Sequence, residues 1–150
     1  MLRVETNSKS VLLEVQQDLQ AFHDKAEMAL QRGVFGAVAM VSNRIKQNGT
    51  NTAGQAMQNK AGAGAYSPQY AKYRQQKGRQ TNKVDLWLTG DLSNAFQVIS
   101  TEPMEATAGF LNEREANKAG YLEEYYGEIW GLSDDEQTDV RELILDEIFN

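Results

Sequence analysis

The 150-residue sequence contains no cysteine, one histidine and two prolines. The lack of cysteine excludes a disulfide scaffold, a thiolate nucleophile and a zinc or iron–sulfur site held by thiolates. No apolar run reaches the roughly 18 residues that a membrane-spanning helix needs, and the N-terminal residues include no apolar segment typical of a signal peptide. We therefore expect a single domain over residues 1–150 that has no membrane partner and works without export.

Residues suited to catalysis are scarce. His23 is the only histidine, it lies beside Phe22 at the edge of an apolar helical stripe, and no nucleophile-elbow sequence accompanies it. Gly62-Ala63-Gly64 lacks the lysine and the Ser/Thr of a phosphate-binding loop. The run from Asp134 to Glu136 fits a helix-capping box better than a cation site. We predict that the chain is not an enzyme and has no catalytic residue, cofactor or metal site.

Charge is distributed unevenly along the chain. Residues 28–84 contain nine lysines and arginines and no acidic residue, whereas residues 85–150 contain sixteen acidic residues and three basic ones. The formal net charge of -6 therefore combines a basic middle with an acidic C-terminal part. Two interpretations are open. The charges form surfaces of opposite sign that meet within one molecule or between copies in a ring, or they are simply solvated.

A long helix is expected over residues 9–47. Apolar residues recur there at steps of three or four, which is the spacing of one helical face. Gly33 and Gly36 interrupt this pattern, and each costs about 1 kcal/mol relative to alanine inside a helix. They mark either a bend or break, or a place where another backbone packs closely. Asn48-Gly49 is a helix stop.

The remaining segments predict shorter elements. Residues 49–65 contain four glycines and no aromatic residue, which predicts a flexible glycine-rich loop that becomes ordered against a partner. Other patterns predict a helix from Ser67-Pro68, a short helix capped by Thr89, a hairpin over 96–100 and 105–111, a helix over 112–125, a short strand or tether over 128–132, and a last helix capped at Ser133. The fold class is α+β: a long N-terminal helix packed on a small antiparallel sheet, with short helices and a capped C-terminal helix.

Aromatic and basic residues alternate over residues 66–83. A segment of this kind can stack bases and hold phosphates, so a nucleic-acid-binding module is the alternative function. The acidic composition of the whole chain argues against it. Further along, large amphipathic side chains of the kind that anchor interfaces occur near the end of the 112–125 helix, although Trp130 also suits a core. The candidate subunit or partner interface comprises Tyr66, Tyr70, Tyr73, Arg74, Lys77, Arg79, Tyr125, Tyr126 and Trp130.

Three short segments follow one another in a fixed order: Tyr66-Ser67-Pro68, then Leu88-Thr89-Gly90 with Leu92, then Gly131-Leu132-Ser133 with Glu136. Their order and spacing resemble the virion-morphogenesis family of tailed bacteriophages, which supplies tail-completion and neck (head–tail joining) proteins. The resemblance extends over nearly the whole chain and is strongest over residues 66–150. Two features depart from the family pattern: EEYYGEIWGLS replaces an aromatic or histidine-rich stretch with a Pro-Arg-Pro-like element before the last segment, and loop 49–65 is longer.

The resemblance implies a non-enzymatic structural virion protein, a ring subunit at the head–tail junction or the top of the tail. It implies further copies of the chain as partners, in a sixfold or twelvefold ring, together with neighbouring neck, adaptor, tail-tube or terminator proteins. DNA would pass through the lumen without sequence-specific binding. The implied location is the neck or tail of the virion, assembled in the host cytoplasm. If the basic segment meets acidic neighbours, charge reversal at Arg74 and Arg79 weakens the ring.

Overall fold

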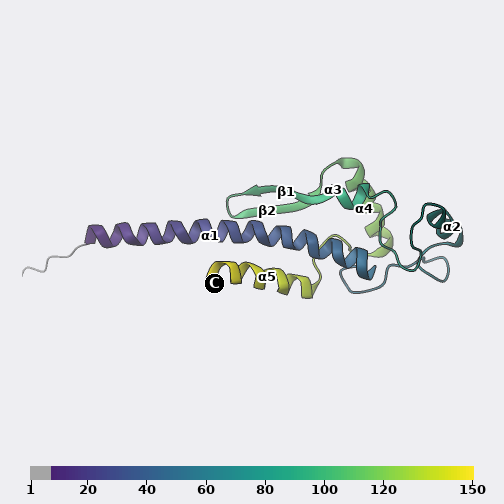
Figure 1. Ribbon diagram of the computed structural model, residues 1–150, viewed down its shortest axis with the longest axis horizontal. Coiled ribbons are helices and arrows are strands. Elements are labelled where there is room, and N and C mark those ends of the chain that lie inside the picture. The colour runs from purple at the N-terminus through teal and green to yellow at the C-terminus, as the bar shows by residue number, and fades with distance from the viewer. Residues whose placement is uncertain (1–7) are drawn as a thin grey trace, which may run out of the picture.

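The computed structural model describes residues 8–150 and is built along one long helix (Figure 1). Helix α1 (Ser8–Asn43) lies between a β-hairpin on one side and the C-terminal helix on the other, while α2 lies at one end of the long axis. After α1 the elements are the π-helical turn η1 (Arg44–Asn48), α2 (Pro68–Gln76), α3 (Asp91–Ala95), β1 (Phe96–Glu102), β2 (Glu105–Phe110), α4 (Glu113–Tyr126) and α5 (Asp134–Phe149). This arrangement confirms the predicted α+β class.

Helix α5 packs closely on α1 at two glycines. A Cβ atom at Gly33 would lie 2.5 Å from Ile144 Cγ1, and one at Gly36 would lie 2.8 Å from Leu143 Cδ2. Helix α1 continues without a break through both positions. Of the two explanations for these glycines, close packing is therefore confirmed. The contact with α5 outweighs the roughly 1 kcal/mol that each glycine costs inside a helix.

The antiparallel hairpin lies along α1 on the side away from α5 (Figure 1). Its register pairs Phe96 with Phe110 at the open end and Glu102 with Glu105 at the turn. Phe96 is buried, and its ring centroid lies 5.4 Å from that of Phe110 and 5.2 Å from that of Trp130. Trp130 therefore packs against the core, which was one of its two predicted roles.

The glycine-rich segment 49–65 contains no helix and a single antiparallel bridge, between Thr50 and Ala56. Met57 is 2% exposed and belongs to the hydrophobic core, and the buried Asn51 side chain donates to the carbonyl oxygen of Tyr126 at 2.9 Å. The sequence predicts that a partner orders this segment, whereas these contacts tie its first half to its own chain. Flexibility of residues 49–65 stays a prediction, and residues 60–64 are exposed throughout.

A buried arginine joins three parts of the chain that are distant in sequence. The Arg44 guanidinium is 7% exposed and donates to the carbonyl oxygens of Thr50, Ile129 and Gly131 at 2.8 to 2.9 Å. Its Nε donates to Glu136 Oε1 at 2.9 Å, and Glu136 is also the third helical residue in the capping box of α5. Because these carbonyl groups bind a side chain rather than another strand, residues 128–132 form a tether, the second of the two predicted alternatives.

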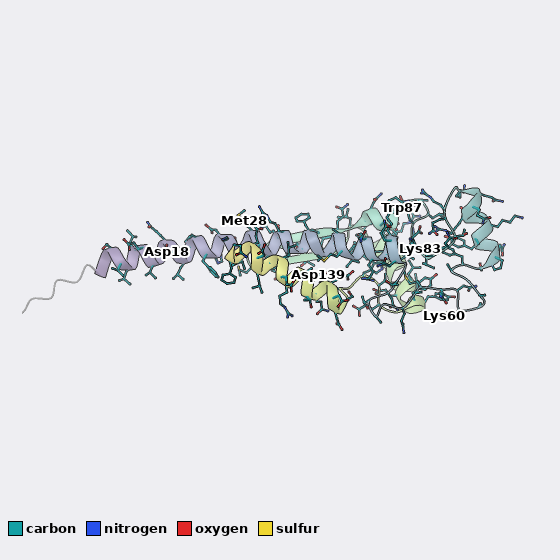
Figure 2. The ribbon with its side chains drawn as sticks, turned by 60° about the horizontal axis from the view of Figure 1, so that its bottom comes forward. Asp18, Met28, Lys60, Lys83, Trp87 and Asp139 are labelled. Atoms are coloured by element: carbon teal, nitrogen blue, oxygen red, sulfur yellow. The ribbon has the colours of Figure 1, made fainter. Side chains whose placement is uncertain are left out.

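The N-terminal half of α1 extends beyond both the hairpin and α5, as the position of Asp18 in Figure 2 shows. Its apolar stripe is exposed there, by 62% at Leu12, 63% at Leu19 and 51% at Phe22. The Phe22 ring reaches Phe149 near the end of α5, at a centroid distance of 6.5 Å. None of the described helices combines the length and apolarity needed to cross a membrane. The stripe is thus longer than the surface that the hairpin and α5 cover.

Gly33→Ala should destabilise the protein, although alanine is the better helix former. The new Cβ would lie 2.5 Å from Ile144 Cγ1. Overpacking of this kind costs about 1–3 kcal/mol, against about 1 kcal/mol gained in helix propensity, so we expect a net loss of up to about 2 kcal/mol. Urea unfolding measures the free energy of unfolding directly.

Gly120→Ala is the matched control, because Gly120 also lies inside a helix and a Cβ there would meet nothing within 4 Å. This control should raise the free energy of unfolding by about 0.5–1 kcal/mol. Equal stabilisation by the two substitutions would contradict the close packing of α1 on α5.

Candidate interaction site

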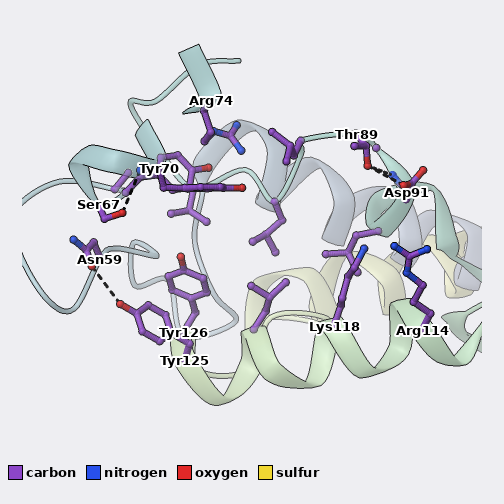
Figure 3. Close-up of a pocket in the computed structure, with 18 residues that line it drawn as sticks. Asn59, Ser67, Tyr70, Arg74, Thr89, Asp91, Arg114, Lys118, Tyr125 and Tyr126 are labelled. Carbon is purple, nitrogen blue, oxygen red and sulfur yellow. Dashed lines mark hydrogen bonds between the residues drawn. The ribbon is translucent and has the colours of Figure 1, made fainter. Parts of the chain in front are cut away.

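An aromatic pocket of about 520 Å³ opens between α2, α3 and α4 (Figure 3). Tyr66 and Tyr70 line it from the start of α2, and Tyr125 and Tyr126 line it from the end of α4. Leucine side chains from residues 86–92 and from α4 complete the apolar part of the wall. Rings and leucines suit an apolar or aromatic group, so the pocket is the first candidate for a binding site.

Local sequence explains why α2 carries one wall of the pocket. Pro68 occupies the first turn of α2, and the Ser67 hydroxyl accepts a hydrogen bond from the Tyr70 N–H at 3.4 Å, which caps the helix. Tyr66, Tyr70 and Tyr73 then follow one side of the helix, with ring centroids 5.4 Å and 6.1 Å apart in turn. The three rings therefore contact one another in sequence order along this side of α2.

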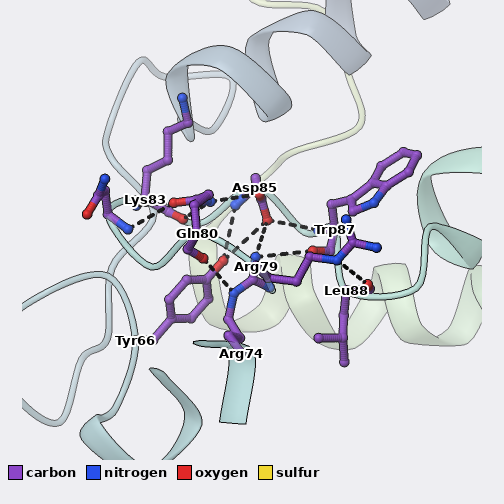
Figure 4. Close-up of polar contacts among 9 residues, drawn as sticks. Tyr66, Arg74, Arg79, Gln80, Lys83, Asp85, Trp87 and Leu88 are labelled. Carbon is purple, nitrogen blue, oxygen red and sulfur yellow. Dashed lines mark hydrogen bonds and ion pairs between the residues drawn. The ribbon is translucent and has the colours of Figure 1, made fainter. Parts of the chain in front are cut away.

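A polar network behind the pocket fixes the irregular segment between α2 and α3 (Figure 4). The Arg74 side chain is fully buried, and its NH2 group donates to Asp85 Oδ1 at 2.9 Å and to the Trp87 carbonyl at 3.1 Å. Its Nε donates to the Gln80 carbonyl at 3.0 Å. The guanidinium also lies 4.5 Å from the centroid of the Tyr66 ring. One arginine therefore joins α2 to the whole of this segment.

The structure corrects the interface prediction for Arg74. Its side chain is 2% exposed and is bound within its own chain, so it does not face a neighbouring subunit. Arg79 is half-buried and donates through Nε to the Leu88 carbonyl at 2.8 Å. Charge reversal at these two arginines would therefore disturb the fold rather than test a ring contact.

Burial raises the pKa of two tyrosines in the pocket. It raises the pKa of Tyr66 above the usual 10.0, and the nearby carboxylate of Asp85 adds to the rise, while a hydrogen bond from the Asp85 backbone N–H to the phenol oxygen opposes it. Burial also raises the pKa of Tyr126. Both phenols therefore lose their proton at a higher pH than an ordinary tyrosine does.

Tyr125 connects α4 to the glycine-rich segment. Its hydroxyl accepts a hydrogen bond from the Lys60 N–H at 2.7 Å, and the Lys60 Nζ lies 5.0 Å from the centroid of its ring. The neighbouring Tyr126 ring meets it edge to face at 4.7 Å. This predicted interface residue is thus one side of the pocket and an anchor for the loop.

The structure separates the nine predicted interface residues into three groups. The outer side of α2 carries Tyr73 and Lys77, with Lys77 Nζ 5.6 Å from the centroid of the Tyr73 ring. Trp130 packs on the core and Arg79 lies behind the pocket, so these two take no part in its lining. The residues that meet in the pocket are Tyr66, Tyr70, Arg74, Tyr125 and Tyr126.

Two basic residues of the pocket are missing from the sequence prediction. Arg114 and Lys118 line it from α4, and Lys118 Nζ lies 3.1 Å from Glu115 Oε1. A usable signal was present, because Arg114, Lys118 and Leu122 recur at steps of four and so share one side of the helix. Both cations pair with Glu115, Arg114 at 3.9 Å and Lys118 at 3.1 Å, so this carboxylate offsets part of their charge at the rim.

Comparisons of the chain with protein-family models, with curated proteins and with solved structures give no match. The role of the pocket therefore rests on its own residues. His23, the only histidine, lies on α1 with its Nε2 3.4 Å from Glu27 Oε1, on the helix rather than in the pocket. Within residues 8–150, no three His, Asp or Glu side chains are grouped to hold a metal ion.

Arg74→Met should lower the free energy of unfolding by about 3–5 kcal/mol, because it leaves the Asp85 carboxylate, which is 12% exposed, without its guanidinium partner. Lys72→Met on the exposed side of the same helix is the matched control and should change stability by less than about 0.5 kcal/mol. Urea unfolding of both variants checks this expectation. A loss of similar size in the two variants would contradict the structural role of Arg74.

Tyr66→Phe should reduce the loss of stability at alkaline pH. The pKa of Tyr66 is raised in the folded chain, so the unfolded chain loses this proton first as the pH rises past 10.0. Above that pH the folded state binds more protons than the unfolded state, and the free energy of unfolding falls. The slope is at most about 1.4 kcal/mol per pH unit, and solvent around the half-buried ring reduces it.

The measurement is the free energy of unfolding of both proteins between about pH 9 and pH 11. The wild-type curve should fall more steeply than the Tyr66→Phe curve in this range. Parallel curves would show that the Tyr66 phenol titrates alike in the folded and unfolded chain.

Proposed function

We propose that the chain is a structural protein of a tailed-phage virion, a ring subunit at the head–tail junction or the top of the tail that joins or finishes the tail. In this role the protein performs no chemistry. It needs a rigid core, surfaces that bind further copies of itself, and surfaces that bind the neighbouring neck or tail proteins. DNA would pass through the ring without sequence-specific contacts.

The observation that carries the proposal is the position of the three segments that resemble the phage family. Tyr66 and Ser67 start α2 and line the pocket, and residues 88–92 line its opposite side and lead into α3. In the third segment, Gly131 and Glu136 bind Arg44. The residues that define the resemblance thus hold the elements of this fold together. This is expected if the sequence pattern reflects a shared structure rather than a shared catalytic reaction.

The exposed apolar stripe of α1 supports a role in assembly. Leu12, Val15 and Leu19 are between 47% and 63% exposed and follow one helical face. Exposed apolar surface of this extent is typical of regions that another protein covers. A subunit that acts only inside a multi-chain particle accounts for it directly.

The alternative function, a nucleic-acid-binding module over residues 66–83, has fewer available cations than the sequence suggests. Arg74 is buried against Asp85, and Arg79 binds the Leu88 carbonyl. Lys72 and Lys77 are the exposed cations on and next to α2. Two cations beside Tyr70 and Tyr73 give a small phosphate-binding surface, so we favour the structural role.

Disruption of the gene in the phage or prophage that encodes the chain tests the proposal. Electron microscopy of the lysate should show DNA-filled heads separate from finished tails if the protein joins the two. Overlong or ragged tails would instead assign it to completion of the tail tube. Complementation with the wild-type gene is the control and should restore intact particles.

Intact, infectious particles in the disrupted lysate would overturn the proposal. In that case, salt-sensitive binding of the purified chain to DNA would favour the alternative function.

A further inference from the structure

Exposed charges of opposite sign lie on two different helices. Along α5, Asp135, Asp139, Glu142 and Asp146 are exposed and recur at steps of four and three, so they form one acidic stripe. The exposed side of α2 and its C-terminal end carry Lys72 and Lys77 in a stretch of chain without any acidic residue. Each surface therefore has a single sign.

Apolar groups accompany the charges on both helices. A shallow groove of about 680 Å³ runs beside the acidic stripe, with Leu143, Leu145 and Phe149 in its lining together with Glu142 and Asp146. Leu145 is 46% exposed and Phe149 is 69% exposed. We call this surface the acidic groove.

Near the end of α2, Lys77 stands beside the exposed Tyr73 ring, and Lys72 flanks Tyr73 on the other side of the helix surface. Tyr70 is 38% exposed and Tyr73 is 43% exposed, and Lys77 Nζ lies 5.6 Å from the centroid of the Tyr73 ring. We call Lys72, Lys77, Tyr70 and Tyr73 the basic face. An apolar centre with charges around it is the usual composition of a protein interface.

The basic face and the acidic groove of one molecule lie too far apart to contact each other. The basic face lies at one end of the long axis, whereas α5 runs beside the middle of α1 (Figure 1), and Asp139 in Figure 2 marks the distance of the acidic groove from that end. Two copies of the same surface would repel each other, which disfavours a symmetric dimer through either face. The complementary arrangement is a head-to-tail contact, which closes into a ring when its rotation allows.

We propose that the basic face of one copy of this chain docks into the acidic groove of the next copy. In this contact Lys72 and Lys77 face Glu142 and Asp146, while Tyr70 and Tyr73 cover the apolar floor of the groove. The proposal rests on the proposed function, since it supplies the contact between subunits that a ring requires.

Charge-swapped pairs of variants test this contact. One variant carries Lys72→Glu and Lys77→Glu, and the other carries Glu142→Lys and Asp146→Lys. All four side chains are exposed, so both variants should fold, and circular dichroism and melting temperature verify that they do. Sedimentation velocity at low ionic strength, over a series of concentrations, reports the oligomers.

The wild-type chain should associate, and each variant alone should associate at least tenfold more weakly because like charges meet at the contact. An equimolar mixture of the two variants should restore association, since each reversed surface then meets a partner of opposite sign. Glu102→Lys with Glu105→Lys at the exposed hairpin turn is the matched control. It changes the net charge as much as the α5 variant does and should associate like the wild type.

Three results would overturn the contact: a wild-type chain that stays monomeric, oligomers that persist in both variants, or a mixture that fails to recover. Salt-sensitive DNA binding that is lost in the α2 variant, with unchanged oligomers, would assign the basic face to DNA and overturn it too. If the variants still form oligomers, the proposed contact is wrong but the proposed virion role stands. If particles stay intact after gene disruption, the virion role is wrong, and the sedimentation test of the contact is unaffected.

Discussion

Three parts of the chain meet at the guanidinium of Arg44: backbone carbonyl groups of Thr50 in the glycine-rich segment and of Ile129 and Gly131 in the tether, and the Glu136 carboxylate in the first turn of α5. Buried carbonyl groups in segments without regular structure need donors from elsewhere. Arg44 supplies them from η1, directly after α1, and its bond to Glu136 holds the first turn of α5 beside the end of α1. Close packing at Gly33 and Gly36 then keeps the rest of α5 along α1, so the arginine and the two glycines together set the position of the acidic groove.

Arg74 has the same function beside α2, where it binds Asp85 and the carbonyl groups of Gln80 and Trp87. Both arginines belong to the basic middle of the chain, so part of its charge lies inside the fold. Arg79 adds a third internal contact, to the Leu88 carbonyl. What faces solvent on α2 is a smaller and better defined surface of two lysines and two tyrosines, which suits a specific protein contact more than the backbone of a nucleic acid.

Periodicity and capping residues were enough to predict the helices and the hairpin, because those elements depend on local spacing. Ser67 and Ser133 cap the helices that they were predicted to start.

The sequence did not reveal the burial of Arg44 and Arg74. Their main partners are backbone carbonyl groups, which every residue has, so no particular residue type signals the contact. The anchoring of the first half of residues 49–65 was missed for a similar reason: Met57 and Asn51 tie it to the chain, although the composition of the segment is that of a free loop. The sequence identified the four tyrosines of the pocket as interface candidates. It could not predict that they line one cavity, because that depends on how α2 and α4 pack in the tertiary structure.

Helix α1 extends beyond the hairpin and α5, so these elements cover only part of its apolar stripe. Phe22 and Gly33 contact α5, and the same series of three- and four-residue steps continues toward the N-terminus through Leu19 to Leu12, beyond the end of α5. Without tertiary packing, a helical segment of this length is marginal in water. The hairpin and α5 leave this part of the stripe exposed. The acidic groove lies along the exposed acidic stripe of α5, whereas the exposed apolar stripe lies on the N-terminal half of α1, so the proposed contact at the groove would not cover it.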